Sequence, residues 1–334
     1  MKSEMKSEIL KSFENKNILI TGGTGMIGYQ VIDILKDTNA KITSISLDNI
    51  KIDNVECIKG DLTDFNLCKK VTKDIDFVFH IAGIKGSIEV TKTKPASFFV
   101  PLLQMNTNIL EACRLNKVQK IVYTSSIGAY SSAEIFKESK ILDNEQPMDS
   151  YPGWAKRMAE MQVKAYKEQY NLDNFAIVRL CNVYGPRDSF DPNSAMVIPS
   201  LIYRIFYKDK LKIDPIVIWG DGRAIRDFAY CRDVAEGIIQ ALYYGTESRY
   251  YNLGSGNGYT IRELVQTLNE ITPFNYEFDT TKLSGYPKRV MDIALAKEKL
   301  GYEPNTTLKD GLLKTWIWFT EHADEFKLKK DYFK

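Results

Sequence analysis

The sequence predicts an α/β fold built on a doubly wound parallel sheet. Short apolar runs of strand length, beginning with residues 17–20, alternate with stretches of helical spacing through the first half of the chain. Strands and helices that alternate in this way form parallel sheets with helices on both faces. A glycine-rich turn between the first strand and the helix that follows it supports the same fold, because such turns are typical of nucleotide-binding βα units.

The glycine-rich turn, residues 21–28, reads TGGTGMIG. Gly22 or Gly23 allows the tight turn, and Gly25 lets the backbone approach a pyrophosphate. Gly28 lets the helix pack against the strand, and the helix N-terminus offers free N–H groups to an anion. The alternative is a turn that serves the fold only. The cofactor contacts predicted in this turn are Gly22, Gly25, Met26, Ile27 and Gly28.

The second strand, residues 41–47, ends at Asp48 and Asn49. A carboxylate at this place accepts hydrogen bonds from both hydroxyls of an adenosine ribose. A 2′-phosphate would meet a like charge there, so Asp48 favours NAD over NADP. The alternative is an Asp-Asn pair that only forms a turn.

Two further strands are expected before residue 90. Residues 55–60 form the third strand, and its exit, Asp61 and Leu62, is placed to flank an adenine. Residues 76–83 form the fourth strand, which ends in small residues. Small residues there let a dinucleotide lie across the strand ends, and Ala82 is the contact predicted among them.

Two polar side chains, Lys85 and His80, lie in or near the fourth strand. Lys85, in the loop after it, could reach a ribose or phosphate of the cofactor, or form part of the solvated surface. His80 lies inside an apolar strand and is interpreted as a packed core histidine. A helix over residues 102–115 and a fifth strand over residues 118–123 continue the alternation.

The parts of a hydride-transfer site follow the fifth strand. Ser126 stands at its end, and Tyr151 and Lys156 stand at the start of a helical stretch that reaches residue 170. The charge of a lysine lowers the pKa of a phenol so that it can take an alcohol proton, while a serine hydroxyl holds the oxygen. Each of the three residues could be structural on its own.

Composition excludes several classes of function. The chain has 334 residues and a net charge of +2, with no basic excess of the kind that binds nucleic acid. Five scattered cysteines and two histidines give no metal-binding spacing, so no metal site is expected. There is no apolar run of bilayer length and no signal-peptide core, so a soluble cytoplasmic protein with no membrane partner is expected.

These motifs together resemble the extended short-chain dehydrogenases/reductases of the NAD-dependent epimerase/dehydratase family. The resemblance continues through RLCNVYGP at residues 179–186 and GDG at residues 220–222, and covers residues 16–327. It implies an NAD-binding Rossmann domain and a smaller C-terminal α/β domain for a nucleotide-diphospho-sugar. The domain bounds it implies are residues 1–182 with about 226–248, and residues 183–225 with 249–334. It also implies a homodimer or higher homo-oligomer, formed through the helices near residues 102–115 and 156–170.

Two groups within the family resemble different parts of the chain. Residues 47–49 and 82–85 are similar to the UDP-galactose 4-epimerases, whereas residues 186–192, 197–199 and 286–292 are similar to the GDP-fucose synthases. The second similarity favours a GDP-sugar over a UDP-sugar. The substrate contacts implied are Ser126, Asn182, Val197, Arg226 and Arg289.

Asn182, Arg226 and Arg289 are expected to contact the phosphates of the sugar nucleotide. The resemblance places Asn182 near the diphosphate. Arg226 would form a charge-assisted pair with phosphate, and its alternative is a pair with Asp221 or Asp227. Arg289 or its neighbour Lys288 would add a second phosphate contact.

The family tyrosine normally stands four residues before the lysine, and Pro152 occupies that place here. Tyr151 is five residues before Lys156, and five steps of a continuous helix turn it away from the lysine's face. If Pro152 begins the helix, Tyr151 stands just outside it and can swing into the site as the base. The alternative is that the base is absent or replaced by water.

Two further departures restrict the reaction. Ile127 and Gly128 stand where the 4,6-dehydratases of the family have an acidic pair, and Met196 stands where the GDP-fucose synthases have a histidine. Hydride removal by NAD at C4 of the sugar remains, as a 4-dehydrogenase or a 4-epimerase in sugar or polysaccharide biosynthesis. The alternatives are an NADPH-dependent 4-keto-sugar reductase and a non-catalytic dinucleotide-binding sensor.

Overall fold

The computed structural model describes residues 3–86, 88–138, 145–191, 194–247, 249–282 and 285–323. Its central feature is a sheet of seven parallel strands in the order β12-β7-β5-β4-β1-β2-β3. The predicted doubly wound parallel sheet is confirmed. Its strands are β1 (Asn17–Thr21), β2 (Lys41–Ser46), β3 (Glu56–Lys59), β4 (Phe77–His80), β5 (Lys120–Ser126), β7 (Phe175–Leu180) and β12 (Tyr250–Leu253).

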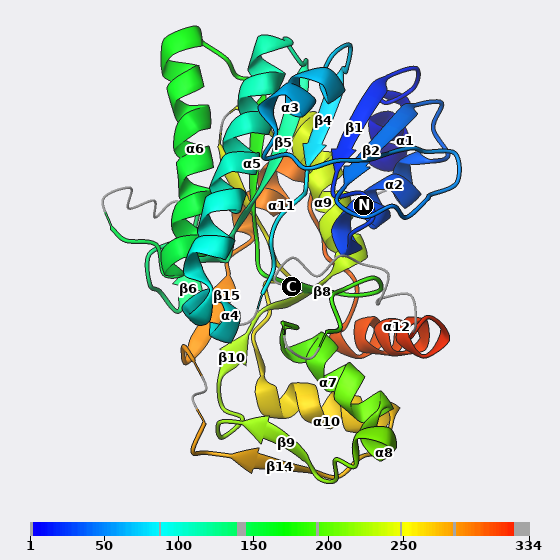
Figure 1. Ribbon diagram of the computed structural model, residues 1–334, viewed down its shortest axis with the longest axis vertical. Helices are drawn as coiled ribbons and strands as arrows, with labels where there is room; N and C mark the ends of the chain where they lie inside the picture. Colours follow the sequence, from blue (N-terminus) through cyan, green and yellow to red (C-terminus); the bar gives the residue numbers. More distant parts are fainter. Residues whose placement is uncertain are drawn as a thin grey trace.

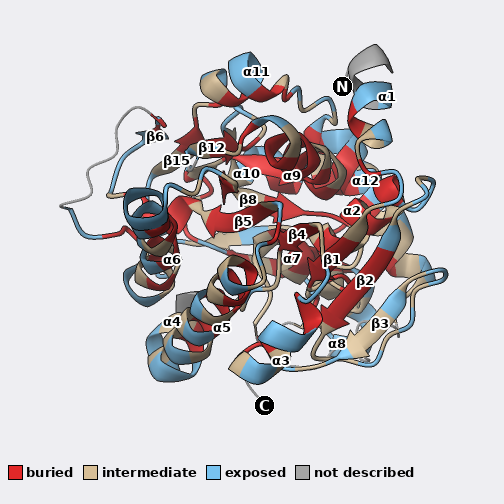
Figure 2. Ribbon diagram, turned by 90° about the horizontal axis from the view of Figure 1, so that it is seen from above, coloured by how far each residue is buried: buried red, intermediate tan, exposed pale blue. Residues whose placement is uncertain are grey.

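Helices cover both faces of this sheet, as the view from above shows (Figure 2). A pair of helices packs on one face, where α1 (Ser3–Lys11) also contributes Ile9 to the core, and a group of three packs on the other. The first pair is α2 (Met26–Leu35) and α9 (Cys231–Tyr244), and the second group is α3 (Phe65–Val71), α5 (Pro95–Leu115) and α6 (Ser150–Tyr170). Burial on both faces explains why β1 is a continuous apolar run: Ile18 and Ile20 join the core under α2, while Leu19 joins the core under α5.

The order of the strands reverses beside β1, which has β2 on one side and β4 on the other. The loops that leave β1 and β4 therefore run to opposite sides of the sheet and open a crevice beyond the strand ends. In sheets of this kind, ligands bind in that crevice. The fold thus places the glycine-rich turn at the point where a nucleotide site is expected.

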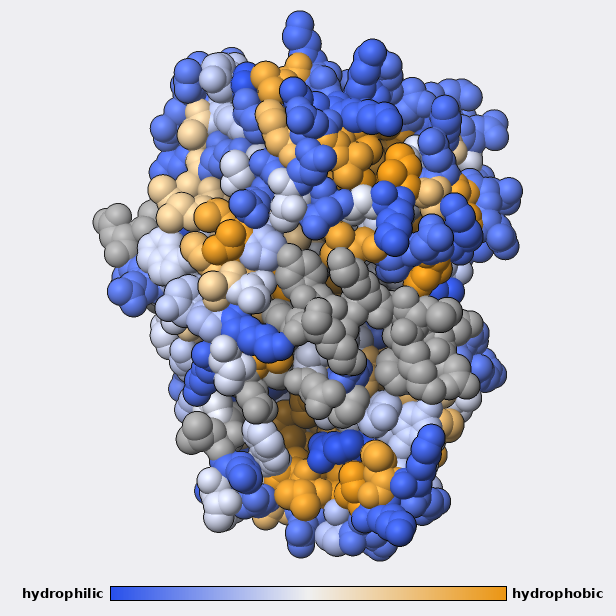
Figure 3. Space-filling view, viewed as in Figure 1, coloured by the Kyte–Doolittle hydropathy of each residue, from blue (hydrophilic) through white to orange (hydrophobic). Residues whose placement is uncertain are grey.

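Most of the remaining elements form a smaller part of the molecule, seen with α7, α10, β9 and β14 in the lower half of Figure 1. It includes one sheet of order β13-β10-β15-β6 and the pairs β11-β8 and β14-β9. Both hydrophilic and hydrophobic side chains show on this face, with hydrophobic ones gathered near its lower end (Figure 3). Four further elements, α1, α4 (Ile88–Thr93), η1 (Ile127–Ala129) and α11 (Ala294–Leu300), pack against the large sheet or its helices. The others are β6 (Ile135–Phe136), β8 (Asn182–Tyr184), α7 (Val197–Phe206), α8 (Lys208–Leu211), β9 (Ile216–Trp219), β10 (Ile225–Arg226), β11 (Phe228–Tyr230), β13 (Tyr259–Thr260), α10 (Ile261–Ile271), β14 (Tyr276–Asp279), β15 (Lys288–Met291) and α12 (Leu308–Glu321).

The structure differs from the expected domain bounds at β12. This strand pairs with β7 at the edge of the large sheet, although residues from 249 onward were assigned to the substrate domain. Its sequence, YYNL, gives a weak strand signal because Asn252 lies in the middle of it. The Asn252 side chain is fully buried and bonds to the carbonyls of Phe136 and Asp292 and the hydroxyl of Tyr130.

Three sequence expectations concern a membrane-spanning helix, a metal site and His80. Within it, no helix is both long and apolar enough to cross a bilayer. The same residues contain no group of three or more His, Cys, Asp and Glu side chains able to hold a metal ion. His80 is fully buried between Thr21 and Asn106, at 2.9 and 3.0 Å, and burial lowers its pKa to about 3. Its interpretation as a packed core histidine is confirmed.

Candidate active site

A cavity of about 550 Å³ opens beyond the ends of β1, β2 and β4. Its lining runs from Gly22 to Ser194, so it brings together segments that are far apart in the sequence, which is what the reversed strand order permits. Asn49 is not among its lining residues. The predicted cofactor contacts that line it are Gly22, Gly25, Met26, Ile27, Gly28, Asp48, Asp61, Leu62, Ala82, Lys85 and Lys156.

The glycine-rich turn has the close contacts that require glycine. Gly22 has a φ of +72°, and a Cβ there would lie 2.9 Å from Cα of Ala82. A Cβ on Gly28 would lie 2.3 Å from the carbonyl oxygen of Gly22. Gly25 is the N-cap of α2 and supplies no side-chain cap, so the first N–H groups of this helix face the cavity without a cap from the chain.

Asp48 is held at the edge of the cavity by two hydrogen bonds. Thr24 Oγ1 donates to Oδ2 at 2.8 Å, and the N–H of Ile50 donates to Oδ1 at 3.2 Å. Each carboxylate oxygen keeps a further lone pair, so the group can still accept ribose hydroxyls. Asp48 thus stands at the cavity edge with acceptor positions that its two hydrogen bonds do not occupy.

Lys85 lines the cavity, but its ammonium group has a partner within the chain. Its Nζ lies 2.7 Å from Oδ1 of Asp188, whose side chain is only 3% exposed. This pair joins the loop after β4 to the loop after β8. The second loop forms a wall of the cavity, and sequence reasoning did not predict that it lies there. Its lining residues are Arg187, Asp188, Ser189, Phe190, Asp191 and Ser194.

Lys156 lies at the other end of the same cavity. Its Nζ donates to the carbonyl of Thr124 at 2.7 Å and lies 5.1 Å from the ring centroid of Tyr123. Burial lowers the pKa of Lys156 to about 8, against an opposing contribution from the charge of Glu160. Near pH 8 this side chain therefore exchanges a proton readily, which an ordinary surface lysine does not do.

Ser126 stands at the end of β5, where its Oγ accepts a hydrogen bond of 3.1 Å from the N–H of Gly128. This contact leaves the hydroxyl hydrogen as a donor for a bound oxygen. A close glycine contact brings the strand end to the helix that carries Lys156. A Cβ on Gly153 would lie 2.3 Å from the carbonyl oxygen of Gly128, and a Cβ on Gly128 would lie 2.4 Å from Oδ2 of Asp149.

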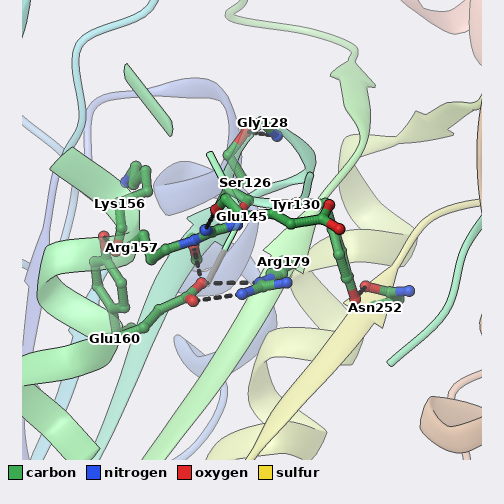
Figure 4. A network of polar contacts seen from close by, with 12 residues as sticks. Ser126, Gly128, Tyr130, Glu145, Lys156, Arg157, Glu160, Arg179 and Asn252 are labelled. Carbon is green, nitrogen blue, oxygen red and sulfur yellow. Dashed lines mark hydrogen bonds and ion pairs between the residues drawn. The ribbon is translucent and has the colours of Figure 1, made fainter. Parts of the chain in front are cut away.

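A buried polar network lies beneath these residues (Figure 4). Ser125 Oγ donates to Oε1 of Glu160 at 2.5 Å, and Arg179 donates to both oxygens of Glu160 at 2.9 and 2.5 Å. The guanidinium of Arg179 lies over the rings of Tyr130 and Tyr250, at 4.0 and 4.3 Å. The network fixes α6 to β5 and β7, and sequence reasoning missed it.

Tyr151 is not brought to the cavity. The helix begins at Ser150 and not at Pro152, so the condition under which Tyr151 would stand outside the helix and swing into the site is not met. Five residues of continuous helix separate Tyr151 from Lys156 by about 140°. The Tyr151 side chain is 50% exposed, and its ring lies 6.0 Å from that of Phe99 on α5.

Arg226 and Arg289 lie beside each other on the neighbouring strands β10 and β15. Arg289 pairs with Asp149 at 2.8 Å. Burial, followed by the charge of Arg289, lowers the pKa of Arg226 to about 10. The two carboxylates considered as partners for Arg226 have other contacts, since Asp227 accepts hydrogen bonds from Ser255, Gly256 and Met291 and Asp221 lies 3.6 Å from Arg223.

None of the predicted substrate residues is among those that line this cavity: Ser126, Asn182, Val197, Arg226 and Arg289 all lie outside its lining. Asn182 begins β8, and its Nδ2 donates to the carbonyl of Asp227 at 3.1 Å. Val197 is the first residue of α7, after the N-cap Met196. The structure thus places Asn182 near the strand pair that carries Arg226, while Val197 begins a separate helix.

The sequence is similar to known proteins over most of its length. The model of the NAD dependent epimerase/dehydratase family matches residues 18–254. The GDP-L-fucose synthase of Sinorhizobium fredii is 30% identical over 319 residues, which cover 93% of this chain and 97% of that protein. The putative UDP-glucose 4-epimerase of Methanocaldococcus jannaschii is 31% identical over 319 residues, which cover 90% and 97%.

A solved structure is similar over nearly the same span. The GDP-L-fucose synthetase from Naegleria fowleri, bound to NADP, is 25% identical with a TM-score of 0.78 and covers 93% of this chain and 96% of that one. The family match spans well over half of the 334 residues, and the motif resemblance is confirmed by it. The chain belongs to the NAD dependent epimerase/dehydratase family, whose members are enzymes that bind NAD or NADP.

Proposed function

We propose that this protein is an NAD-dependent oxidoreductase acting at C4 of a nucleotide-diphospho-sugar, as a 4-dehydrogenase or a 4-epimerase in sugar or polysaccharide biosynthesis. One observation carries the proposal: Asp48 and Lys156 open onto the same cavity of about 550 Å³. The first suits an adenosine ribose, and the second suits the reactive end of a dinucleotide. NAD, when bound, supplies the acceptor for a hydride.

The chain's own side chains supply the remaining chemistry. Ser126 donates its hydroxyl hydrogen to the sugar oxygen, because Gly128 already occupies an acceptor position of Oγ. The positive charge of Lys156 holds the ribose next to the reacting carbon and favours loss of the alcohol proton. Tyr151 was the predicted base, and its ring packs on Phe99. We therefore favour the alternative in which water beside Lys156 receives the proton.

NAD is proposed as the cofactor on the basis of Asp48. A 2′-phosphate next to this carboxylate would meet a like charge with no cation between them, which disfavours NADP. A relative of known structure is bound to NADP, and this observation supports the second candidate, an NADPH-dependent 4-keto-sugar reductase. The third candidate, a non-catalytic dinucleotide sensor, is supported by the position of Tyr151.

A GDP-sugar is proposed as the substrate, held by Arg226 and Arg289. Two half-buried guanidinium groups side by side repel each other, and a diphosphate between them would supply negative charge in addition to that of Asp149. Asn182 and Val197 are proposed as further contacts. Residues 183–225 and the chain beyond β12 are proposed as the nucleotide-sugar domain.

A homodimer through α5 and α6 is also proposed. Large apolar side chains on these helices are exposed, with Val100 at 46%, Met158 at 42% and Met161 at 55%. An exposed apolar face of this kind is typical of an oligomer interface. Analytical ultracentrifugation of the wild type and of a Met161→Glu variant tests the proposal, because the charge is expected to shift the protein towards monomer.

The proposed reaction is tested with purified protein, NAD and a panel of GDP- and UDP-hexoses. The readouts are the absorbance of reduced nicotinamide and the stereochemistry of the sugar by NMR. Lys156→Met is expected to abolish turnover, and Lys164→Met, an exposed lysine on the same helix, is the matched control. Absence of NADH, keto-sugar and epimer with every sugar nucleotide would contradict the proposal. Turnover that requires NADPH would favour the reductase.

A further inference from the structure

The loop from Gly185 to Asp191 faces the glycine-rich turn across the cavity. Arg187 and the first residues of α2 line the same space. The guanidinium carbon of Arg187 lies 3.9 Å from the ring centroid of Tyr29, which belongs to the first turn of α2, and 5.9 Å from that of Trp318 on α12. Arg187 therefore brings a positive charge to the N-terminal end of the helix from the opposite side of the cavity.

This position needs an electrostatic explanation. The N-terminus of a helix carries about half a positive charge, and cations are unfavourable there. α2 has no acidic residue in its first turn and no side-chain cap at Gly25, so the helix itself does not offset that charge. A guanidinium at such a place is suited to an anion that binds between it and the helix N-terminus.

The backbone of the loop holds Arg187 in this position. Its φ is +66°, in the left-handed region that is unfavourable for a side chain larger than glycine. The next residue, Asp188, is buried and anchors the loop, since it accepts from Nζ of Lys85 at 2.7 Å and from the N–H of Ser189 at 2.7 Å. Unfavourable backbone conformations persist where surrounding contacts fix them, and they are frequent at ligand sites.

We propose that Arg187 binds the pyrophosphate of the dinucleotide from the side opposite the glycine-rich turn. The planar fork of a guanidinium matches two phosphate oxygens. Lys85 acts on this contact through Asp188, as a positioning residue, and not by touching the cofactor. The inference rests on the proposed dinucleotide site and adds a second wall to it.

The test measures binding of NAD and of ADP-ribose by calorimetry, with no turnover required. Arg187→Met is expected to weaken both affinities about ten- to hundred-fold, the usual range for a lost charge-assisted contact to phosphate. Arg187→Lys should fall between the wild type and Arg187→Met. Arg249→Met, which removes an exposed arginine remote from the cavity lining, is the matched control. The wild-type affinity should also fall more steeply with salt than that of Arg187→Met.

The role of Lys85 is tested by a double-mutant cycle with Lys85→Met. If Lys85 acts through the loop, the double variant binds NAD no more weakly than Arg187→Met alone. Additive losses would show that Lys85 touches the dinucleotide directly and would overturn the positioning role.

Two further outcomes separate the proposals. If the wild type binds neither NAD nor ADP-ribose, the proposed function itself fails. If the wild type binds both and Arg187→Met binds them within twofold, with only a lower melting temperature, then Arg187 joins α2 to α12 and this inference is overturned.

Discussion

Arg226 and Arg289 are register partners on two parallel strands, and the carboxylate of Asp149 lies 2.8 Å from Arg289. Two guanidinium groups and one carboxylate thus meet in a partly buried place. Buried like charges reduce stability unless a counter-charge binds. We therefore expect removal of one guanidinium group to stabilise the free protein and to weaken substrate binding.

Arg226→Met is expected to raise the melting temperature of the free protein, because it removes a desolvated charge beside Arg289. It should also raise the KM for the nucleotide sugar at least about tenfold, the usual effect of losing a charge-assisted contact. Thermal unfolding and steady-state kinetics measure the two effects. Arg223→Met, at a side chain that is 88% exposed, is the control and should change neither. An unchanged KM would remove Arg226 from the proposed substrate site.

Lys156 predicts a pH dependence of the reaction. Its pKa is lowered to about 8, so its positive charge is lost as pH rises through 8. If that charge holds the ribose and favours proton loss, kcat/KM should fall above about pH 8. In Lys156→Arg any remaining activity should persist to higher pH, since guanidinium stays protonated. A profile with the same descending limb in both proteins would contradict this role.

The same group predicts a pH dependence of stability. Between about pH 8 and the ordinary lysine pKa of 10.5, the unfolded chain binds a proton that the folded chain does not. Stability contributed at this site therefore rises with pH across that window. The free energy of unfolding in urea should therefore rise more between pH 7 and pH 10 for the wild type than for Lys156→Met. Equal changes in the two proteins would contradict the lowered pKa.

Tyr151→Phe is expected to keep activity within a few-fold of the wild type, because the ring lies against Phe99 and does not line the cavity. Loss of a general base costs about 10²–10⁴ in rate. A loss of that size, with a normal melting temperature, would restore Tyr151 as the base that the sequence predicts. The measurement is kcat with the best sugar nucleotide found.

Asp48→Ala is expected to weaken NAD binding and to improve NADP binding, so that the ratio of the two affinities falls or the preference for NAD over NADP reverses. The reason is the loss of the ribose acceptor together with the loss of a charge that repels a 2′-phosphate. Competition calorimetry with the two dinucleotides measures it. Asp53→Ala, at an exposed carboxylate on the following loop, serves as the control and should leave the preference unchanged.

Arg179→Met is expected to destabilise the fold by about 3–5 kcal/mol, because it leaves the buried carboxylate of Glu160 without its charged partner. Guanidinium unfolding measures the change. The exposed pair of Lys309 and Glu270 is the control, and Lys309→Met should leave the free energy of unfolding unchanged within error. A small effect of Arg179→Met would mean that Glu160 takes up a proton or finds another donor.

The sequence predicted those parts of the fold and cavity that depend on local pattern. The glycine-rich turn, Asp48 and Lys156 were all located from spacing along successive strands and helices, and the cavity unites them. Each of these residues follows directly from the end of a strand or the start of a helix, so its place in space follows from its place in the chain.

The parts that were missed depend on contacts between distant residues. Arg179 lies in the strand sequence FAIVRL and pairs with Glu160 on the preceding helix, which no periodicity reveals. The wall that carries Arg187 is irregular backbone and has no repeating pattern. The start of α6 was misplaced because Pro152 is favoured in the first turn of a helix but does not fix which position it takes there.

The contact between Gly128 and Gly153 also limits how this enzyme can change. A side chain at residue 153 would meet the carbonyl oxygen of Gly128, and a side chain at residue 128 would meet Asp149. An acidic side chain at residue 128, where the dehydratases of the family have one of their paired acids, would thus force the end of β5 and the start of α6 apart. Substitutions that change the reaction are therefore expected in the surrounding loops, while the contact between the end of β5 and the start of α6 stays rigid.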